Sequence, residues 1–222
     1  MSRTAVVTGA TGVLGNLVAK TFAGHGYNLA LLDKDQGKLD SMVRDLSLPA
    51  NRLYAQAIDL LDGPATHASA EAVAAKFGGV HGLIHLVGGW TGGRTIPETG
   101  AEDFGSMLNQ HAWTTFNLFK SFAPHLAASG WGRVVTLSIP LSVHPMPKMG
   151  AYAAGKAAQE ALVQTMAEEF KGTGVTANII HVQSIDTRGE GRGTPPEEIV
   201  STIMNLFSDE ADNMSGAIIP LY

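Results

Sequence analysis

The chain contains no cysteine, which excludes a disulfide scaffold, a thiolate zinc site, an iron–sulfur cluster and a cysteine nucleophile. It also has no block of positive charge. Its net charge is −5 and its lysines and arginines are scattered, so no nucleic-acid partner is expected. No apolar run approaches the ~18 residues of a membrane-spanning helix, and the first residues lack the pattern of a signal peptide. These absences predict a soluble cytoplasmic protein with no membrane partner.

The composition is that of a globular protein, with 45% hydrophobic and 16% charged residues among 222. It is too apolar for a disordered chain and fits one domain spanning residues 1–222. Glycine is in excess: an average usage of about 7% would give roughly 16 glycines, and the chain has 26. Because no Gly-X-Y repeat is present, the surplus needs a local explanation.

Short apolar runs alternate with longer stretches of helical periodicity from end to end. Several short runs are continuous in valine, isoleucine and leucine, as strands buried on both faces of a sheet require. The alternation predicts an α/β fold: a doubly wound parallel sheet of about seven strands with helices on both faces. The predicted strands are Thr4–Thr8, Asn28–Leu32, Leu53–Ile58, Gly82–Leu86, Arg133–Leu137, Thr176–Val182 and Ala217–Pro220. The predicted helices are Leu14–Gly24, Gln36–Leu46, Gly63–Phe77, Phe104–Ser129, Tyr152–Lys171 and Pro196–Phe207, the last with a capping box of Thr194, Pro195 and Glu197.

Three glycines follow the first predicted strand and open the first helix, in the segment Thr8–Gly15. Gly9, Gly12 and Gly15 allow a tight turn and let backbone N–H groups approach a pyrophosphate at the positive end of the helix. The spacing differs from the usual Gly-x-Gly-x-x-Gly, and the turn alone is also compatible with a plain strand-to-helix connection. Asp33 ends the second strand 24 residues after Gly9, near the ~20 expected for the acid that binds the adenosine ribose.

The charge at position 33 bears on the choice of cofactor. A carboxylate accepts hydrogen bonds from the ribose hydroxyls and repels a 2′-phosphate, so Asp33 favours NAD over NADP. Lys34 beside it leaves room for NADP, and the alternative role of Asp33 is a cap for the helix that follows.

Tyr152 and Lys156 stand four residues apart at the start of a predicted helix, which places the phenol and the ammonium on one helical face. A nearby cation favours the tyrosinate and is expected to lower the phenol pKa from about 10. The pair suits a general acid/base that delivers a proton to a carbonyl oxygen while a nicotinamide delivers hydride. The spacing is common by chance and gains meaning from the glycine turn and Asp33 before it.

In this order and spacing the chain resembles the short-chain dehydrogenase/reductase family along essentially its whole length, through Thr8–Gly15, Asp33, Asp59-Leu60, Tyr152–Lys156, Asn178 and Ile185–Thr187. The resemblance implies a Rossmann fold, oxidoreductase activity on a small molecule, and a homo-oligomer, dimer or tetramer, formed through the helices that begin at Phe104 and Tyr152. It implies that Lys156 also holds the nicotinamide ribose. The cofactor-binding residues that it implies are Gly9, Thr11, Gly12, Val13, Leu14, Gly15, Asp33, Lys34, Asp59, Leu60, Val87, Gly88, Gly89, Tyr152, Lys156, Ile185 and Thr187.

Two members of the family's catalytic set are missing from their usual places. The serine, normally thirteen residues before the tyrosine, falls on Ile139, with Ser138 one place earlier and Ser142 three later. A shift of one residue at the strand end would bring Ser138 into place; otherwise Ser142 or a water must polarise the substrate oxygen. The family's asparagine falls on His111, which either serves in a proton relay, since imidazole accepts and donates, or packs between helices.

The other histidines in predicted strands are expected to be structural. His85 and His181 are interpreted as hydrogen-bonded core side chains rather than ligands. No grouping of His, Asp or Glu has the spacing of metal ligands, so no metal site is predicted.

Four glycines surround Trp90 in the segment Val87–Gly93. This segment is similar to one in dihydropteridine reductases, as are Gln110–Thr114 and the strand end without serine. On that resemblance the alternative reaction is reduction of a quinonoid dihydropterin, with Trp90 stacking on the planar ring. The other interpretation of Trp90 is an anchor that packs beneath its loop.

Alternating glycines in Arg188–Gly193 stand where the family usually has a longer lid. They cannot hold a helix, so this loop is expected to be mobile and the site open, with Arg188 and Arg192 solvated. The departures from the family leave a third interpretation, a non-catalytic NAD(P)-binding sensor or regulator. The intact pair of Tyr152 and Lys156 argues against it.

Overall fold

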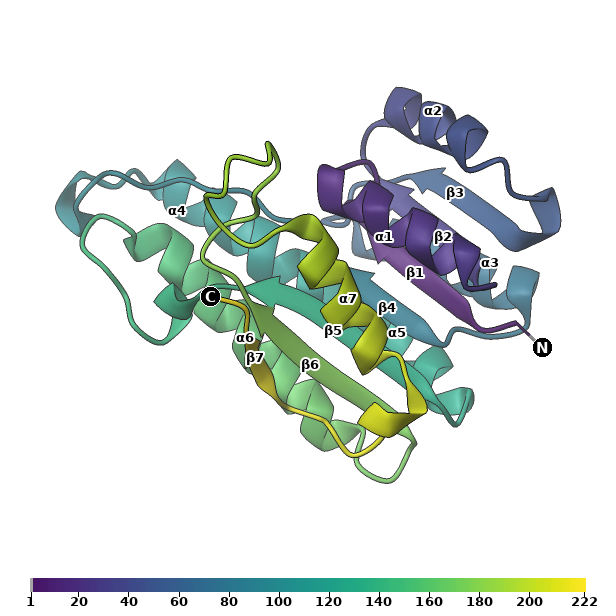
Figure 1. Ribbon diagram of the computed structural model, residues 1–222. Coiled ribbons are helices and arrows are strands. Elements are labelled where there is room, and N and C mark those ends of the chain that lie inside the picture. The colour runs from purple at the N-terminus through teal and green to yellow at the C-terminus, as the bar shows by residue number, and fades with distance from the viewer. Residues whose placement is uncertain (1) are drawn as a thin grey trace.

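Seven parallel strands form one sheet in the computed structural model, which describes residues 2–222 (Figure 1). Their order is β3-β2-β1-β4-β5-β6-β7, so the chain builds outward from β1 to one edge, returns past β1, and continues to the other edge. Every neighbouring pair is parallel. The doubly wound sheet expected from the sequence alternation is confirmed.

The elements begin and end close to their predicted positions. The strands are β1 (Thr4–Thr8), β2 (Asn28–Asp33), β3 (Leu53–Ala57), β4 (Gly82–His85), β5 (Gly132–Ser138), β6 (Val175–His181) and β7 (Ile218–Pro220). The α-helices are α1 (Val13–Gly24), α2 (Gln36–Leu46), α3 (Gly63–Phe77), α4 (Ala101–Leu108), α5 (Thr114–Ala128), α6 (Gly150–Glu169) and α7 (Pro196–Leu206).

The sheet is buried on both faces, as its continuous apolar strands require. Alternate residues of β1 enter different cores, with Ala5 and Val7 in one and Val6 in the other. Residues of α1, α2 and α7 complete the first core, and residues of α3, α5 and α6 complete the second. In Figure 1, α1 and α7 lie in front of the sheet and α5 and α6 behind it.

The strand order reverses between β1 and β4, which lie side by side at the centre of the sheet. In an open parallel sheet such a reversal leaves a crevice beyond the carboxyl ends of the strands, where ligands bind. The three glycine-rich segments follow β1, β4 and β6. All three therefore leave the sheet at this edge.

The long helix predicted over Phe104–Ser129 is confirmed as one uninterrupted helical stretch, residues 101–128, but it is not α-helical throughout. The structure has α4, then a π-helical segment at Asn109–Trp113, then α5. A π segment adds one residue to the hydrogen-bonded ladder of a helix and is frequent at functional sites. Here it carries His111.

The capping box predicted for the last helix is also wrong. The Thr194 hydroxyl donates to the carbonyl of Leu221 at 2.6 Å, and α7 begins after Pro195 without a side-chain cap. A capping box closes a different turn, where Thr95 and Glu98 bond each other. The Thr194 hydroxyl therefore bonds the C-terminal segment instead of capping the helix as the local sequence pattern predicts.

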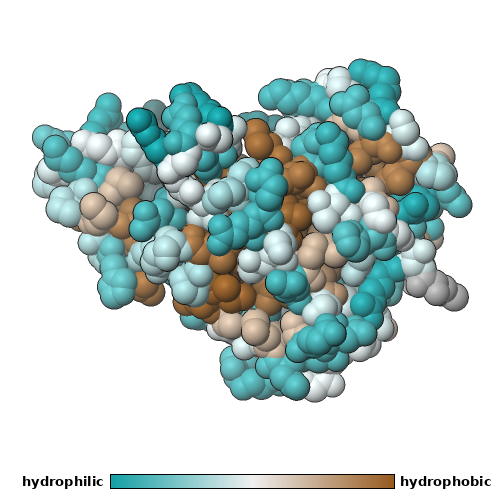
Figure 2. All heavy atoms as spheres, in the orientation of Figure 1, coloured by the Kyte–Doolittle hydropathy of each residue, from teal (hydrophilic) through white to brown (hydrophobic). Residues whose placement is uncertain are grey.

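Among the helices of residues 2–222, none is both long and apolar enough to cross a bilayer. Figure 2 shows hydrophilic atoms over most of the visible face, interrupted by a hydrophobic band.

Gly15 lies where α1 crosses the turn that precedes it. A Cβ on Gly15 would stand 2.3 Å from the carbonyl oxygen of Gly9 and 2.7 Å from that of Ala10, closer than real atoms approach. Gly24 ends the same helix with nothing within 4 Å of its Cβ position. The two glycines therefore differ in what a methyl group would meet.

Gly15→Ala is expected to lower the free energy of unfolding by about 1–3 kcal/mol, the usual range for overpacking, because the turn must move to admit the methyl group. Gly24→Ala is the matched control and is expected to leave stability unchanged or raise it by up to about 1 kcal/mol. Urea unfolding followed by circular dichroism measures both variants. Equal stabilities would contradict the close approach at Gly15.

Candidate functional site

The larger cavity at the crevice has a volume of about 860 Å³ and lies beyond the carboxyl ends of β1, β2 and β4. The structure brings together the first glycine turn, the acid that ends β2 and the loop after β4. The predicted cofactor-binding residues that line this cavity are Gly9, Thr11, Gly12, Asp33, Lys34, Asp59, Leu60, Val87 and Gly88.

Helix α1 begins at this cavity with its positive end unneutralised. Its N-cap residue Gly12 lines the cavity and offers no side-chain cap, and no acidic residue stands in the first turn, which contains Val13, Leu14 and Gly15. The N–H groups of that turn suit a pyrophosphate. Gly9 has φ +66°, and a Cβ there would stand 3.1 Å from the backbone of Leu86. These residues fit a dinucleotide.

Asp33 is held in a fixed orientation at the end of β2. Its Oδ2 accepts hydrogen bonds from the N–H and the hydroxyl of Thr11 at 2.9 and 2.8 Å, and its Oδ1 accepts one from the N–H of Lys34 at 2.8 Å. The cap of α2 is Asp35, which accepts from the N–H of Lys38. The alternative role of Asp33 as the cap of that helix is therefore wrong.

A second cavity of about 480 Å³ adjoins the first. Leu86, Val87 and Gly88 line both, so these three residues form the junction of the two cavities. The second cavity collects the predicted residues Tyr152, Lys156, Ser138, His111 and Trp90 together with Gly89 and Ile185. Its remaining lining residues are His85, Leu137, Ile139, Leu141, Met149, Val182, Gln183 and Ser184.

The Lys156 ammonium is buried at the wall of the second cavity, with only 6% of the residue exposed. It donates hydrogen bonds to the carbonyl of Leu137 at 2.8 Å and to Oε1 of Gln159 at 2.9 Å. Burial lowers the pKa of Lys156 to about 8, and the negative charge of Glu160 opposes this effect. The side chain is therefore still charged at pH 7.

The pKa of Tyr152 moves in the direction opposite to the one expected from the sequence. Burial of the phenol raises its pKa above the usual value of 10.0. The charge of Lys156 four residues away does not reverse this. Tyr152 is therefore protonated at neutral pH, the form in which it donates a proton.

His111 lies between Tyr152 and the loop after β4. Its ring centroid is 5.4 Å from that of Tyr152, in an edge-to-face arrangement, and its Nε2 is 3.0 Å from the carbonyl of Gly89. Because a carbonyl only accepts, Nε2 carries the proton, and Nδ1 is an acceptor with no partner among residues 2–222. Burial lowers the pKa of His111 to about 3, so the ring is neutral.

The two serines near the end of β5 differ in the surroundings of their hydroxyl groups. Ser138 lines the second cavity, but its hydroxyl oxygen is buried and makes no hydrogen bond of good geometry with any residue from 2 to 222. The Ser142 hydroxyl donates to the carbonyl of Ile139 at 2.8 Å. Ile139 itself lines the cavity at the position of the family's serine.

The two core histidines are hydrogen-bonded, as predicted. His85 Nδ1 lies 2.7 Å from the Thr8 hydroxyl, and His85 Nε2 lies 3.4 Å from that of Thr114. His181 Nε2 lies 2.8 Å from Oε1 of Glu160, and both side chains are buried. That interpretation is confirmed.

The buried Glu160 was not found by sequence reasoning. Burial alone would raise its pKa, but the polar groups of His181, Ser138 and Ser142 more than reverse this, and its pKa lies below the usual 4.5. A signal was present in the sequence. Gln159 and Glu160 interrupt a run of small apolar residues one turn after Lys156.

Trp90 stands open rather than beneath its loop. It is 61% exposed and lines the second cavity. A Cβ on Gly92 would stand 3.0 Å from both the Trp90 ring and the Met149 sulfur, so the glycine leaves room for these two side chains, which both line the cavity. The interpretation as a packed anchor does not hold.

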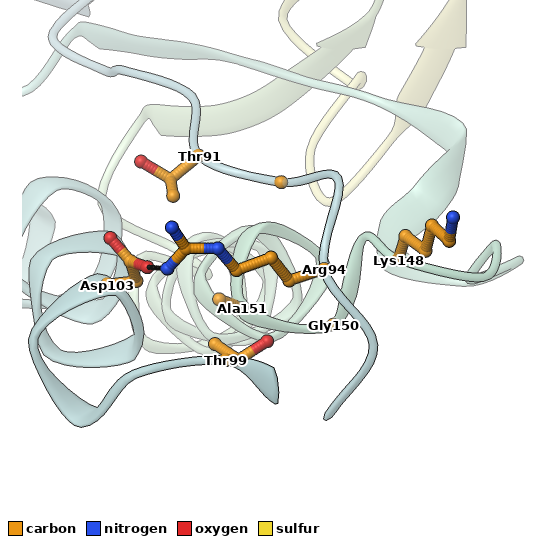
Figure 3. A pocket seen from close by; sticks show the side chains of 8 residues that line it. Thr91, Arg94, Thr99, Asp103, Lys148, Gly150 and Ala151 are labelled. Atoms are coloured by element: carbon orange, nitrogen blue, oxygen red, sulfur yellow. Dashed lines mark hydrogen bonds and ion pairs between the residues drawn. The ribbon is translucent and has the colours of Figure 1, made fainter. Parts of the chain in front are cut away.

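A third, smaller cavity of about 140 Å³ lies beside this loop (Figure 3). Arg94 reaches across it and donates to Asp103 at 3.1 Å, while the Lys148 side chain points away. The guanidinium is thus already paired at an exposed position, where an ion pair contributes little.

The loop for which mobility is predicted is exposed, and hydrogen bonds hold its turns and its neck. The Asp186 carboxylate accepts from the N–H groups of Glu190 at 3.0 Å and Gly191 at 2.7 Å, and its pKa is lowered chiefly by these backbone bonds. The neck is closed by two backbone hydrogen bonds, from Asp186 to Thr194 and from Thr194 to Ser184. The glycines at 189, 191 and 193 have positive φ and so permit the tight turns of the loop.

Of the two cofactor-binding residues predicted beside this loop, the structure places one at a cavity and the other outside the two larger cavities. Ile185 lines the second cavity, whereas Thr187 is exposed and lines neither of the two larger cavities among residues 2–222. Arg188 and Arg192 are exposed. No group of three or more His, Asp or Glu within residues 2–222 is placed to hold a metal ion.

Comparisons with known proteins agree on the fold and the family of this chain. The family model described as short chain dehydrogenase matches residues 3–197. A 3-oxoacyl-[acyl-carrier-protein] reductase of Thermotoga maritima is 23% identical over 96% of this chain and 94% of the reductase. A short-chain type dehydrogenase/reductase from Mycobacterium ulcerans has a TM-score of 0.91 at 24% identity, covering 100% of this chain and 90% of that one.

One further solved structure is an NADPH-bound short chain oxidoreductase from Pseudomonas aeruginosa that contains an atypical catalytic center. It has a TM-score of 0.90 at 25% identity, and the alignment covers 99% of this chain and 95% of that one. The family model covers most of the chain and the fold agrees over its full length. The chain belongs to the short chain dehydrogenase family of oxidoreductases.

Proposed function

We propose that residues 1–222 act as a single NAD(P)-binding domain that transfers hydride between nicotinamide and a small substrate, a carbonyl or alcohol compound or a conjugated acceptor. NAD is the preferred cofactor. The observation that carries the proposal is the junction of the two cavities at Leu86, Val87 and Gly88. One cavity fits a dinucleotide, and the other presents Tyr152 and Lys156.

Tyr152, Lys156 and His111 of the second cavity each have their own role in the reaction. A bound nicotinamide supplies or accepts the hydride. The Tyr152 phenol is protonated at neutral pH, and burial raises its pKa further above 10.0. It donates its proton to the substrate oxygen as charge develops there. The Lys156 ammonium stabilises the phenolate that remains. His111, whose pKa is about 3, accepts a hydrogen bond at Nδ1 and supplies no proton.

Ile139 favours a second candidate within the same chemistry. With hydrocarbon at this wall and the Ser138 hydroxyl buried, the substrate oxygen has less help from the protein than a ketone needs. A quinonoid dihydropterin is already polarised and needs less. The exposed Trp90 ring at the cavity mouth is available to stack on such a planar ring.

The presence of Ile139 where the family has its catalytic serine also motivates a candidate of another class, a protein that binds NAD(H) without turnover. The two classes differ in what Tyr152 does. A sensor catalyses no proton transfer, so removal of the Tyr152 hydroxyl leaves its function, the binding of NAD(H), unchanged.

Tyr152→Phe is expected to lower turnover by at least about 100-fold, the usual contribution of a positioned acid, while NADH binding stays within about twofold. Turnover is measured as cofactor consumption with a panel of ketones, quinones and quinonoid dihydropterin, and binding by NADH fluorescence. Tyr54→Phe on β3 removes a hydroxyl that donates to Gln56, away from both cavities, and is the control. Full activity in Tyr152→Phe would overturn the assignment of Tyr152 as the general acid. If the wild-type protein binds NADH but turns over no acceptor of the panel, the non-catalytic sensor is favoured.

Asp33 supports the preference for NAD, because its fixed carboxylate lines the adenosine end of the cleft and repels a 2′-phosphate. Calorimetry is expected to show NADH binding at least about fivefold more tightly than NADPH, and Asp33→Asn is expected to remove most of that difference. Asp40→Asn, on the exposed face of α2, removes the same charge elsewhere and should keep the preference. Equal affinities of the wild type for the two cofactors would contradict the proposal.

We also propose a homo-oligomer formed through the outer face of α5 and the π segment. Trp113 and Phe116 pack edge-to-face there, 5.7 Å apart between ring centroids, yet are 54% and 42% exposed. Large aromatic side chains that remain exposed on a helix face are typical of interfaces.

Phe116→Glu is expected to convert the oligomer to monomer, because it places a charge in the apolar centre of the contact. Light scattering after gel filtration measures the mass. Met214→Glu, at a similarly exposed apolar position outside this face, should leave the mass unchanged. A monomeric wild type would exclude the proposed oligomer.

A further inference from the structure

Two buried polar residues follow Lys156 after one turn of α6, and Gln159 contacts the ammonium directly. Gln159 is 1% exposed, and its Oε1 accepts a hydrogen bond from Nζ of Lys156 at 2.9 Å. Its Nε2 donates to the Thr115 hydroxyl at 3.2 Å, and that hydroxyl donates to the carbonyl of His111 at 2.6 Å. Three hydrogen bonds thus join the ammonium to the π segment.

The direction of each of these bonds is fixed by chemistry. A carbonyl only accepts, so the Thr115 proton is committed to His111, and the Thr115 oxygen must accept from the amide nitrogen of Gln159. The amide oxygen is then turned toward Lys156. A side chain without an amide breaks both contacts, whereas a carboxylate keeps the contact to Lys156 and loses the one to Thr115.

The ammonium has one donor left after these contacts. Of its three N–H groups, the Leu137 carbonyl takes one at 2.8 Å and Gln159 takes another. The Lys156 nitrogen lies 3.9 Å from the place where a Cβ on Gly88 would stand, at the junction of the two cavities. Fixing two of the three N–H groups sets the direction of the third.

The charges that face Lys156 come from three elements. His85 on β4 and His111 on the π segment are neutral, since burial lowers the pKa of each to about 3. Tyr152 on α6 is protonated at neutral pH. Glu160, also on α6 and paired with His181 of β6, is a negative charge that favours the ammonium.

We propose that Gln159 is a positioning residue: through Thr115 it anchors the Lys156 ammonium to the carbonyl of His111, keeps it charged and aims its free N–H at the junction of the two cavities. The proposal rests on the proposed function, because the direction of this N–H matters to the reaction only where Tyr152 and Lys156 form the catalytic pair.

The first test needs no cofactor. Burial lowers the pKa of Lys156 from 10.5 to about 8 in the folded chain, so the unfolded chain binds more protons between these values. The stability contribution of Lys156 therefore rises with pH across that window. Gln159→Leu removes an acceptor, so the rise should begin about one pH unit lower; Gln159→Glu adds negative charge and should delay it by a similar amount.

Urea unfolding from about pH 6 to pH 10 measures this window, and the same series with Lys156→Met in each background isolates the lysine. Gln164→Leu, on the exposed face of the same helix, is the control and should not move the window. Opposite shifts in the Leu and Glu variants support the proposal. A Gln159 that only packs would lower stability at every pH without moving the window, and that result overturns it. If Gln159→Leu fails to fold, the Glu variant alone decides.

The second readout is the pH profile of turnover with an acceptor from the panel. The fall of the reduction rate at high pH, where Lys156 loses its proton, should move in the same opposite directions, with kcat of Gln159→Leu about tenfold lower. The variants Lys156→Met and Tyr152→Phe distinguish failure of the proposed function from failure of the positioning role of Gln159. If both keep turnover, the proposed function fails. If both lose it while the Gln159 variants keep the wild-type window, only the positioning role is overturned.

Discussion

A buried ammonium is the constraint around which the reacting end of the cleft is arranged. Lys156 is charged inside the protein only because carbonyl and amide oxygens take its N–H groups and Glu160 stands one turn away. Its neighbours can come this close because Gly155 has no side chain. A Cβ there would stand 2.7 Å from the carbonyl oxygen of Met107 and 3.1 Å from the His111 ring, so α6 lies directly against α4 and the π segment.

The features predicted from the sequence are those that local chemistry determines. Strands buried on both faces must be continuous in apolar residues, and that pattern indicated several of the central strands. The alternation of short apolar runs with helical stretches located the half-exposed β3 and β7 as well. The turn from Gly9 to Gly15 and the acid at Asp33 could be read because spacing along the chain fixes their place at the end of a strand. Tyr152 and Lys156 share a face for the same reason, since four residues span about one helical turn.

The features that were missed depend on partners distant in sequence. Gln159 meets Thr115, which is 44 positions away, and Glu160 meets His181, which is 21 positions away. Thr194 has the residue type of a helix cap, but its hydroxyl goes to Leu221. The pKa of Tyr152 was predicted in the wrong direction because burial, the larger effect, cannot be read from a spacing of four residues.

The π segment at Asn109–Trp113 has a consequence for how this protein can change over evolution. A π turn closes its hydrogen bond over one residue more than an α turn, and each residue of a helix turns its successor by about 100°. The same added residue therefore sets both the approach of His111 to Gly89 and the outward direction of Trp113. A deletion there would rotate both together, so the interior of the site and the character of the outer surface are inherited as one trait.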